Sequence, residues 1–203
     1  LLFLAKGRRP ILISQLKHGR GRDWNPHRSS IKNLTRRMEQ RWRRDLTWQT
    51  IDIRTATVDD LLETPVLFIS GRDSLELSSD QKNNLREYIN QGGFIFAEAC
   101  CGGVGFDRSF RTLIKELFKD SSMQLLPPDH PVWYAEEKVD SDYLRPLYGI
   151  DACCRTSIIY CPQDLSCFWE LNHNGRDSAY SANVQAEIEA CLKDDTIRIL
   201  NRG

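Results

Sequence analysis

Apolar segments alternate with amphipathic segments along the first 120 residues of the chain. Short apolar or alternating segments are typical of strands, and apolar residues spaced by three and four are typical of helices. The predicted strands cover residues 10–17, 48–53, 66–70 and 94–99, and the predicted helices cover residues 29–44, 58–62, 78–91 and 106–118. This alternation predicts a parallel sheet with helices on both faces.

Local signals support the central part of this pattern. The unbroken apolar runs Val66–Ile69 and Phe94–Ala97 favour strands that are buried on both faces, as in a parallel sheet. Ser78 and Gln81 have the spacing of a capping box, and two glycines follow the predicted end of that helix. We therefore predict an α/β fold, a three-layer α/β/α sandwich with a mostly parallel, flavodoxin-like sheet.

The second half of the chain is less regular. Residues 123–134 are rich in proline and are predicted to form a loop, residues 155–161 a strand and residues 181–192 a helix. The sequence has no internal repeat and no low-complexity tract. We expect one domain over residues 1–203, with residues 1–9 as a tail and residues 120–150 as an irregular insertion.

The composition is that of a soluble globular domain. The 203 residues are 40% hydrophobic and 28% charged, and the net charge of zero creates no overall attraction to nucleic acid or to an anionic membrane. No apolar run approaches the roughly 20 residues of a membrane span. Five arginines lie within residues 36–44, but a solvated helix face normally carries such charge, so we expect no nucleic-acid binding. Because the chain begins with Leu1, we expect a piece of a longer protein.

Seven cysteines are available for chemistry or cross-linking. Two pairs are vicinal, Cys100-Cys101 and Cys153-Cys154, and neighbouring residues rarely meet disulfide geometry. No Cys-x-x-Cys pair occurs, so the usual spacing of a structural zinc site is absent, and we predict no metal and no cofactor. A disulfide or metal site in the cysteine-rich second half is the alternative, with Cys153, Cys154, Cys161, Cys167 and a histidine as its candidate residues.

Cys100 and Cys101 stand where a predicted buried strand meets a run of glycines. A strand, a sharp turn and a helix together present the nucleophile in many α/β enzymes, and a thiolate is a strong nucleophile. Ligands of open parallel sheets bind beyond the carboxyl ends of the strands. The candidate ligand-binding residues at those ends are Asp23, Trp24, Gly71, Arg72, Glu98 and Gly102.

Two functions fit these residues. The first is the binding of a small polar ligand, such as a sugar or a carboxylate, or of a partner protein at a cleft around Cys100 and Cys101. The second is a cysteine-dependent hydrolase or amidase, with Cys100 or Cys101 as nucleophile and His130, on the loop 127–131, as base. There are simpler roles for these residues. The cysteines would pack as small apolar side chains in the core, and His130 would fix a turn through its ring nitrogens.

The order of strand, cysteine, glycine and helix resembles the class I glutamine amidotransferase-like fold. The nucleophile turn of that fold reads Gly-x-Cys-x-Gly, and the matching frame here is Glu98-Ala-Cys100-Cys-Gly102, with Glu98 in place of the first glycine. The active cysteine of that fold works with a His-x-Glu element. None of the four histidines here is followed at the second position by glutamate. The resemblance implies a member that lacks this catalytic pair.

A wider set of motifs covers most of the chain. It consists of Asp23-Trp-Asn25, Leu67–Gly71, Gly92–Gly102, Phe106-Asp107, Pro127–Pro131 and Tyr160–Glu170. Together these motifs resemble the bacterial domain-of-unknown-function family numbered 4159, which is itself similar to the ThuA-like proteins of the amidotransferase-like superfamily. The resemblance implies an α/β fold but no particular activity.

Overall fold

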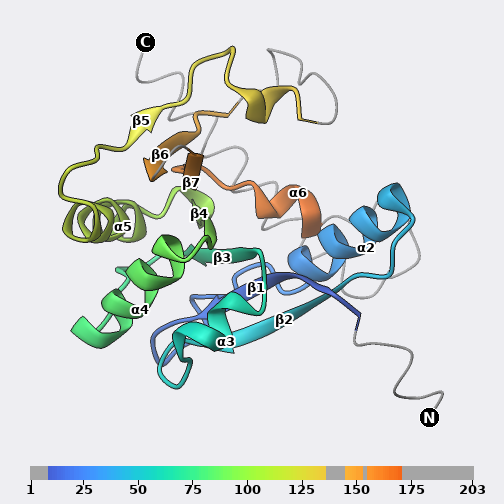
Figure 1. Ribbon diagram of the computed structural model, residues 1–203, viewed down its shortest axis with the longest axis horizontal. Coiled ribbons are helices and arrows are strands. Elements are labelled where there is room, and N and C mark those ends of the chain that lie inside the picture. Colours follow the sequence, from blue (N-terminus) through green and yellow to red (C-terminus); the bar gives the residue numbers. More distant parts are fainter. Residues whose placement is uncertain (1–8, 136–144, 153–154, 171–203) are drawn as a thin grey trace.

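The computed structural model describes residues 9–135, 145–152 and 155–170. Strands and helices alternate along the chain, as the sequence predicts (Figure 1). The elements in chain order are β1 (Ile11–Lys17), α2 (Ser30–Trp42), β2 (Thr47–Asp52), α3 (Val58–Leu62), β3 (Val66–Gly71), α4 (Ser79–Asn90), β4 (Phe94–Ala99), the 3-10 helix η1 (Cys100–Gly102), α5 (Val104–Leu117), β5 (Gln124–Leu125), the 3-10 helix η2 (Pro131–Trp133), β6 (Tyr148–Ala152), β7 (Arg155–Cys161) and α6 (Ser166–Glu170).

The strands form one seven-stranded sheet in the order β2-β1-β3-β4-β7-β6-β5. The five strands from β2 to β7 in this order are parallel, while β6 is antiparallel to β7 and β5 is antiparallel to β6. This confirms the predicted α/β fold with a mostly parallel sheet. The chain starts at β1, moves outward to β2 and then returns past β1 to β3, so the strand order reverses between β1 and β3. Such a reversal opens a crevice at the carboxyl ends of the strands.

Alternate residues of the central strands face opposite sides of the sheet. Leu67 and Ile69 of β3 join a cluster with α3, α4 and α5, whereas Phe68 joins a second cluster with residues of α2 and α6. Figure 1 shows α2 and α6 together on one side of the sheet and α4 and α5 on the other. The period-two alternation of apolar side chains therefore supplies a core on each face.

The predicted boundaries are close to those of the structure. The predicted strands 94–99 and 155–161 coincide with β4 and β7. The capping box is present: the Ser78 hydroxyl accepts a hydrogen bond from the Gln81 amide, and the Gln81 side chain accepts one from the Ser78 amide. Helix α2 ends where Arg43 adopts a left-handed conformation with φ of 51°.

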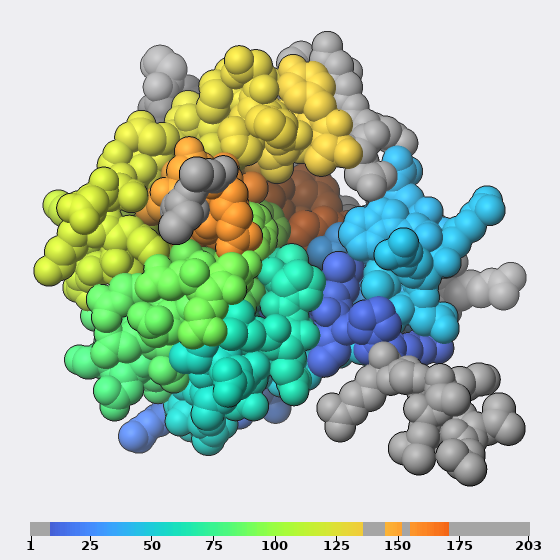
Figure 2. All heavy atoms as spheres, in the orientation of Figure 1, coloured from blue at the N-terminus to red at the C-terminus, as the bar shows by residue number. Residues whose placement is uncertain are grey.

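The region after α5 is more ordered than the predicted loop at residues 123–134. It contains β5 and η2, because Leu126 and Trp133 are buried against Ile159 of β7. Figure 2 shows this segment in yellow along one edge of the molecule. Strand β6 and helix α6 had no clear signal in the sequence, and the helix predicted at residues 181–192 lies outside the described residues. In the described part of the chain, no helix has the length and apolar character needed to cross a membrane.

Helix α5 should be anchored to the sheet mainly by Phe110. This side chain is fully buried, and its ring stacks on Tyr160 with a centroid distance of 4.8 Å. We expect Phe110→Ala to lower the free energy of unfolding by about 3–5 kcal/mol in urea titrations. Val104→Ala on the same helix is the control, because Val104 is 60% exposed and its truncation should cost less than about 0.5 kcal/mol. Equal effects of the two substitutions would contradict this packing.

Candidate functional site

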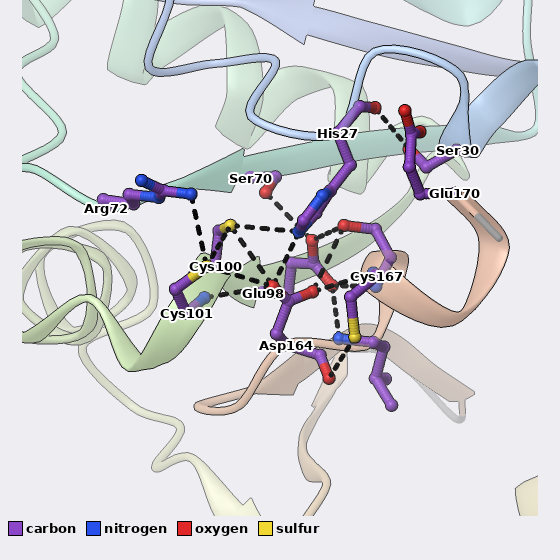
Figure 3. A network of polar contacts seen from close by, with 12 residues as sticks. His27, Ser30, Ser70, Arg72, Glu98, Cys100, Cys101, Asp164, Cys167 and Glu170 are labelled. Carbon is purple, nitrogen blue, oxygen red and sulfur yellow. Dashed lines mark hydrogen bonds and ion pairs between the residues drawn. The ribbon is translucent and has the colours of Figure 1, made fainter. Parts of the chain in front are cut away.

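A network of buried polar side chains lies at the carboxyl ends of the parallel strands. Its members come from the ends of β3 and β4, the loop after β1 and the loop after β7 (Figure 3). Glu98, Cys100 and Asp164 are fully buried and His27 is 6% exposed. Groups of this kind are costly to bury unless they are paired with one another.

The turn after β4 has an unusual backbone. Cys101 adopts a left-handed conformation with φ of 52° and ψ of 32°, and Gly102 follows with φ of 64°. A left-handed residue other than glycine costs roughly 1–2 kcal/mol. The strained position of the turn therefore belongs to Cys101, while Cys100 lies one residue earlier and is buried beneath it.

Close backbone packing holds this turn against the end of β3. A Cβ atom on Gly103 would lie 2.5 Å from the Cα atom and carbonyl oxygen of Arg72, so only glycine fits there. The Phe106 amide, in the first turn of α5, donates a hydrogen bond of 3.2 Å to the same carbonyl oxygen of Arg72. The glycines thus fix the position of both cysteines relative to β3.

Glu98 joins three segments of the site. One carboxylate oxygen accepts hydrogen bonds from the Leu165 and Ser166 amides at 2.9 and 2.8 Å. The other oxygen accepts from the hydroxyl of Ser70 at 2.9 Å and from the hydroxyl of Ser166. Burial and the nearby charge of Asp164 raise the pKa of Glu98 to about 7, although these hydrogen bonds favour the ionised form. Glu98 therefore holds the loop between β7 and α6 against β3 and β4.

That loop places Asp164 between His27 and the two cysteines. The Asp164 Oδ2 atom accepts a hydrogen bond of 2.7 Å from His27 Nε2 and one of 3.1 Å from the Cys101 amide. The Cys100 thiol lies 3.3 Å from the same oxygen and 3.4 Å from His27 Nε2. The Cys167 amide donates to the other carboxylate oxygen at 2.9 Å.

These contacts determine the charge states of the three groups. Burial lowers the pKa of His27, but the hydrogen bond and the charge of Asp164 outweigh burial and raise it. Burial raises the pKa of Asp164, and the contacts with His27 more than compensate, so that pKa is lowered. Burial and the charges of Asp164 and Glu98 raise the pKa of Cys100 far above its usual range. These shifts favour a charged His27–Asp164 pair beside a neutral Cys100 thiol.

The geometry is convergent. In a catalytic triad, the nucleophile and the carboxylate contact opposite nitrogens of the histidine ring, so that the histidine takes the proton of the nucleophile while the carboxylate orients the ring. Here the Cys100 thiol and the Asp164 carboxylate both contact His27 Nε2. The potential metal-binding atoms of His27, Cys100, Cys101 and Asp164 all lie within 4.8 Å of one another.

The two cysteines of the pair differ in state. Their sulfur atoms are 3.4 Å apart, well beyond the roughly 2.05 Å of a disulfide, which agrees with the expectation that neighbours do not bridge. Cys101 is disulfide-bonded, whereas Cys100 carries a free thiol, as do Cys161 and Cys167. Cys100 therefore supplies the thiol of this pair.

Most of the candidate residues from the sequence lie around this turn. The Asp23 carboxylate accepts hydrogen bonds from the Arg72 and Asp73 amides at 2.9 and 3.2 Å, which links the loop after β1 to the end of β3. A Cβ atom on Gly71 would lie 2.7 Å from this carboxylate. The guanidinium of Arg72 donates to Cys101 Sγ at 3.3 Å. Trp24 contributes a carbonyl oxygen that accepts from Gln15 at 3.2 Å.

His130 lies at the other end of β7. Its Nε2 atom contacts the Thr156 hydroxyl at 3.2 Å, and its Nδ1 atom accepts a hydrogen bond from the Val132 amide. Thr156 is near the start of β7, and the five steps from there to Cys161 span roughly 17 Å at the usual strand rise. The contact between His130 and Cys100 that the hydrolase hypothesis requires is not formed, and His130 instead fixes the turn before η2.

The histidine and the second carboxylate of the site were not among the candidates. His27 follows β1 by ten residues, and Asp164 follows β7 by three. The strand-end rule that selected Asp23 and Arg72 applies equally to Asp164, because the strand 155–161 was predicted correctly. For His27 the sequence held no such signal, since the path of the loop from residue 18 to residue 29 decides where it lies.

A comparison with protein-family models identifies the family of this chain. The model described as Domain of unknown function (DUF4159) matches residues 12–193. The chain belongs to the DUF4159 family. A comparison with curated proteins gave no match. His27, Glu98, Cys100, Cys101 and Asp164 all lie within the DUF4159 match, so the strand-end network is built from the family's own domain.

Removal of Glu98 should release the loop that carries Asp164. Glu98→Ala leaves two buried amides and two hydroxyls without their acceptor, so we expect a loss of about 4 kcal/mol in the free energy of unfolding. Glu98→Gln keeps an acceptor for the two amides and should lose less than half as much. Urea titrations of both variants measure this difference.

The matched control for these variants is Glu87→Ala, at an exposed glutamate on α4 whose carboxylate accepts a 3.4 Å hydrogen bond from Asn90. We expect a change within about 0.5 kcal/mol. A Glu98→Ala variant as stable as Glu87→Ala would show that Glu98 does not hold the loop.

Proposed function

We propose that this DUF4159 domain binds a small anionic ligand, of the carboxylate class, at the carboxyl ends of β1, β3, β4 and β7. The observation that carries the proposal is the cluster of buried polar side chains that contact one another at these strand ends: His27, Glu98, Cys100 and Asp164. Clusters of this kind are typical of functional sites, because a protein gains no stability from burying charges that it could leave in water.

The proposal includes a relationship to the amidotransferase-like superfamily and a three-layer, flavodoxin-like arrangement of residues 1–203 as one domain. The strand order supports this relationship, because the five parallel strands follow the order 2-1-3-4-5 of flavodoxin-like sheets. In such sheets the ligand lies where the strand order reverses. Asp23 and Arg72 meet at that place, between the ends of β1 and β3.

The Arg72 guanidinium at the rim provides a contact for an anion. Arg72 is exposed, and its guanidinium lies beside the strained turn of Cys101 and Gly102. A guanidinium presents two parallel N–H donors that match the two oxygens of a carboxylate. A small ligand suits this place better than a protein partner, because the groups beneath the rim are buried and lie beyond the reach of a flat protein surface.

Two observations weigh against the alternative, a cysteine-dependent hydrolase or amidase with Cys100 as nucleophile and His130 as base. Cys100 is fully buried and its pKa is raised, whereas a reactive cysteine needs access and a lowered pKa. His130 is engaged by Thr156 and Val132 at the opposite end of β7. A site that binds a ligand needs neither a reactive cysteine nor a histidine base, so ligand binding agrees with both observations.

Thermal unfolding in the presence of small probes tests the proposal. We expect succinate or citrate, at matched ionic strength, to raise the Tm of the protein more than glucose does. At about 100 times the Kd, the stabilisation of about 2.7 kcal/mol corresponds to roughly 5–10 °C for a domain of this size. Arg72→Ala should remove the shift, because it deletes the proposed carboxylate contact.

Arg37→Ala, at an exposed arginine of α2, is the control for a general loss of positive charge and should keep the full shift. An equal shift in Arg72→Ala would place the binding elsewhere. The absence of any shift with succinate and citrate would contradict the binding of small carboxylates.

A further inference from the structure

Three potential metal ligands converge beneath the proposed rim. His27 Nε2, Cys100 Sγ and Asp164 Oδ2 come from three different segments, yet they lie between 2.7 and 3.4 Å from one another. We propose that these three atoms bind one divalent transition-metal ion of the zinc class. This inference rests on the proposed function, because the metal ion would lie in the same strand-end site, beneath the proposed ligand.

The separations of the three atoms are close to those of a tetrahedral site. Bonds of about 2.3 Å to sulfur and about 2.0–2.2 Å to nitrogen and oxygen place pairs of ligands about 3.4–3.6 Å apart. The observed distances from Cys100 Sγ are 3.4 Å to His27 Nε2 and 3.3 Å to Asp164 Oδ2. The distance between His27 and Asp164 is much shorter, at 2.7 Å, because a proton lies between these two atoms.

The charges around the three atoms support the proposal. Glu98, Asp164 and Glu170 are buried carboxylates of this network, and Glu170 accepts a hydrogen bond from the Ser29 amide. The basic side chains of the network are His27, which contacts Asp164, and the exposed Arg72 at the rim. A divalent cation bound by Asp164 and Cys100 is attracted by these carboxylates, and it favours the thiolate form of Cys100.

The donor set selects the class of metal. One thiolate, one imidazole and one carboxylate suit zinc and neighbouring transition metals, whereas calcium and magnesium prefer oxygen ligands alone. The proposal uses only three side chains. Cys101 belongs to the same group of potential ligands, but it is disulfide-bonded. Three protein ligands leave one tetrahedral position for water or for an anionic group of a ligand.

Metal binding exchanges protons for the ion without any redox change. The Cys100 thiol releases one proton and His27 Nε2 releases another, and three bonds to the metal replace the three contacts between these atoms. The supporting contacts are already present. The Cys101 and Cys167 amides hold the Asp164 carboxylate, and Glu98 holds the loop that carries it. Such outer contacts fix a ligand in place before the metal arrives.

Cobalt(II) binding to the chelator-treated, dialysed full chain tests the proposal. We expect one equivalent of Co²⁺ to bind with a thiolate-to-cobalt charge-transfer absorption, and Zn²⁺ to displace it. Cys100→Ser should abolish this absorption, and His27→Gln should weaken Co²⁺ binding by about 100-fold or more. Cys161→Ser is the matched control, because Cys161 is also a buried free cysteine but lies outside the convergent group, and it should keep the absorption.

Near-ultraviolet circular dichroism verifies that each variant is folded. If Cys100→Ser does not fold, His27→Gln and the wild-type titration still decide the matter. Failure of the wild type to bind one equivalent, an absorption that survives in Cys100→Ser, or full affinity in His27→Gln would each overturn the metal site.

Thermal shifts with succinate on the metal-free protein separate this inference from the proposed function. A succinate shift without cobalt binding refutes the metal site alone. Cobalt binding without a succinate shift, in either the metal-free or the Zn²⁺-loaded protein, refutes carboxylate binding alone.

Discussion

The buried carboxylate of Glu98 is the interaction on which the rest of the strand-end site depends. It is the fifth residue of β4, and it accepts hydrogen bonds from Ser70 of β3, from Leu165 in the loop after β7 and from Ser166, the first residue of α6. An ionised carboxylate with this many donors can stay buried, whereas an apolar residue at this position would leave the donors unpaired. By binding the loop after β7, Glu98 also determines where Asp164 lies. The turn that carries Cys100 and Cys101 is held separately, by the close packing of Gly103 against Arg72.

The arrangement of this network separates two kinds of chemistry that the same residue types can perform. A cysteine, a histidine and an aspartate form a relay only if the histidine uses both ring nitrogens, one for each partner. In this domain both partners contact one nitrogen, and the thiol is neutral and buried. The ligand atoms of His27, Cys100 and Asp164 therefore point toward one another. A metal ion requires ligands that converge in this way, whereas a nucleophile requires a histidine that contacts the nucleophile and the carboxylate through different nitrogens.

The sequence was sufficient for the fold because each parallel strand has a local signal. The runs at residues 66–69 and 94–97 are apolar on both faces, and the intervening helix 78–91 has its own cap and terminal glycines, so no distant contact was needed to identify them. Strand β6 shows the limit. Tyr148, Ile150 and Ala152 alternate with Gly149 and Asp151, but this signal is short and glycine and aspartate are unfavourable in strands, so pairing with β7 gives the segment its conformation. Tertiary context decides such segments.

The site shows a similar division between local and distant information. Cys100 and Cys101 were found because the turn that carries them is encoded by the glycines beside them. His27 and Asp164 are 137 residues apart in the sequence, and only the path of two loops brings them to 2.7 Å. The sequence analysis predicted His130 at the same rim. That prediction was wrong because the local sequence of a proline-rich loop does not determine the path of the loop. In the structure Leu126 and Trp133 pack against β7 and direct that loop toward the opposite end of the sheet. Burial of Leu126 and Trp133 thus keeps His130 away from the cysteines.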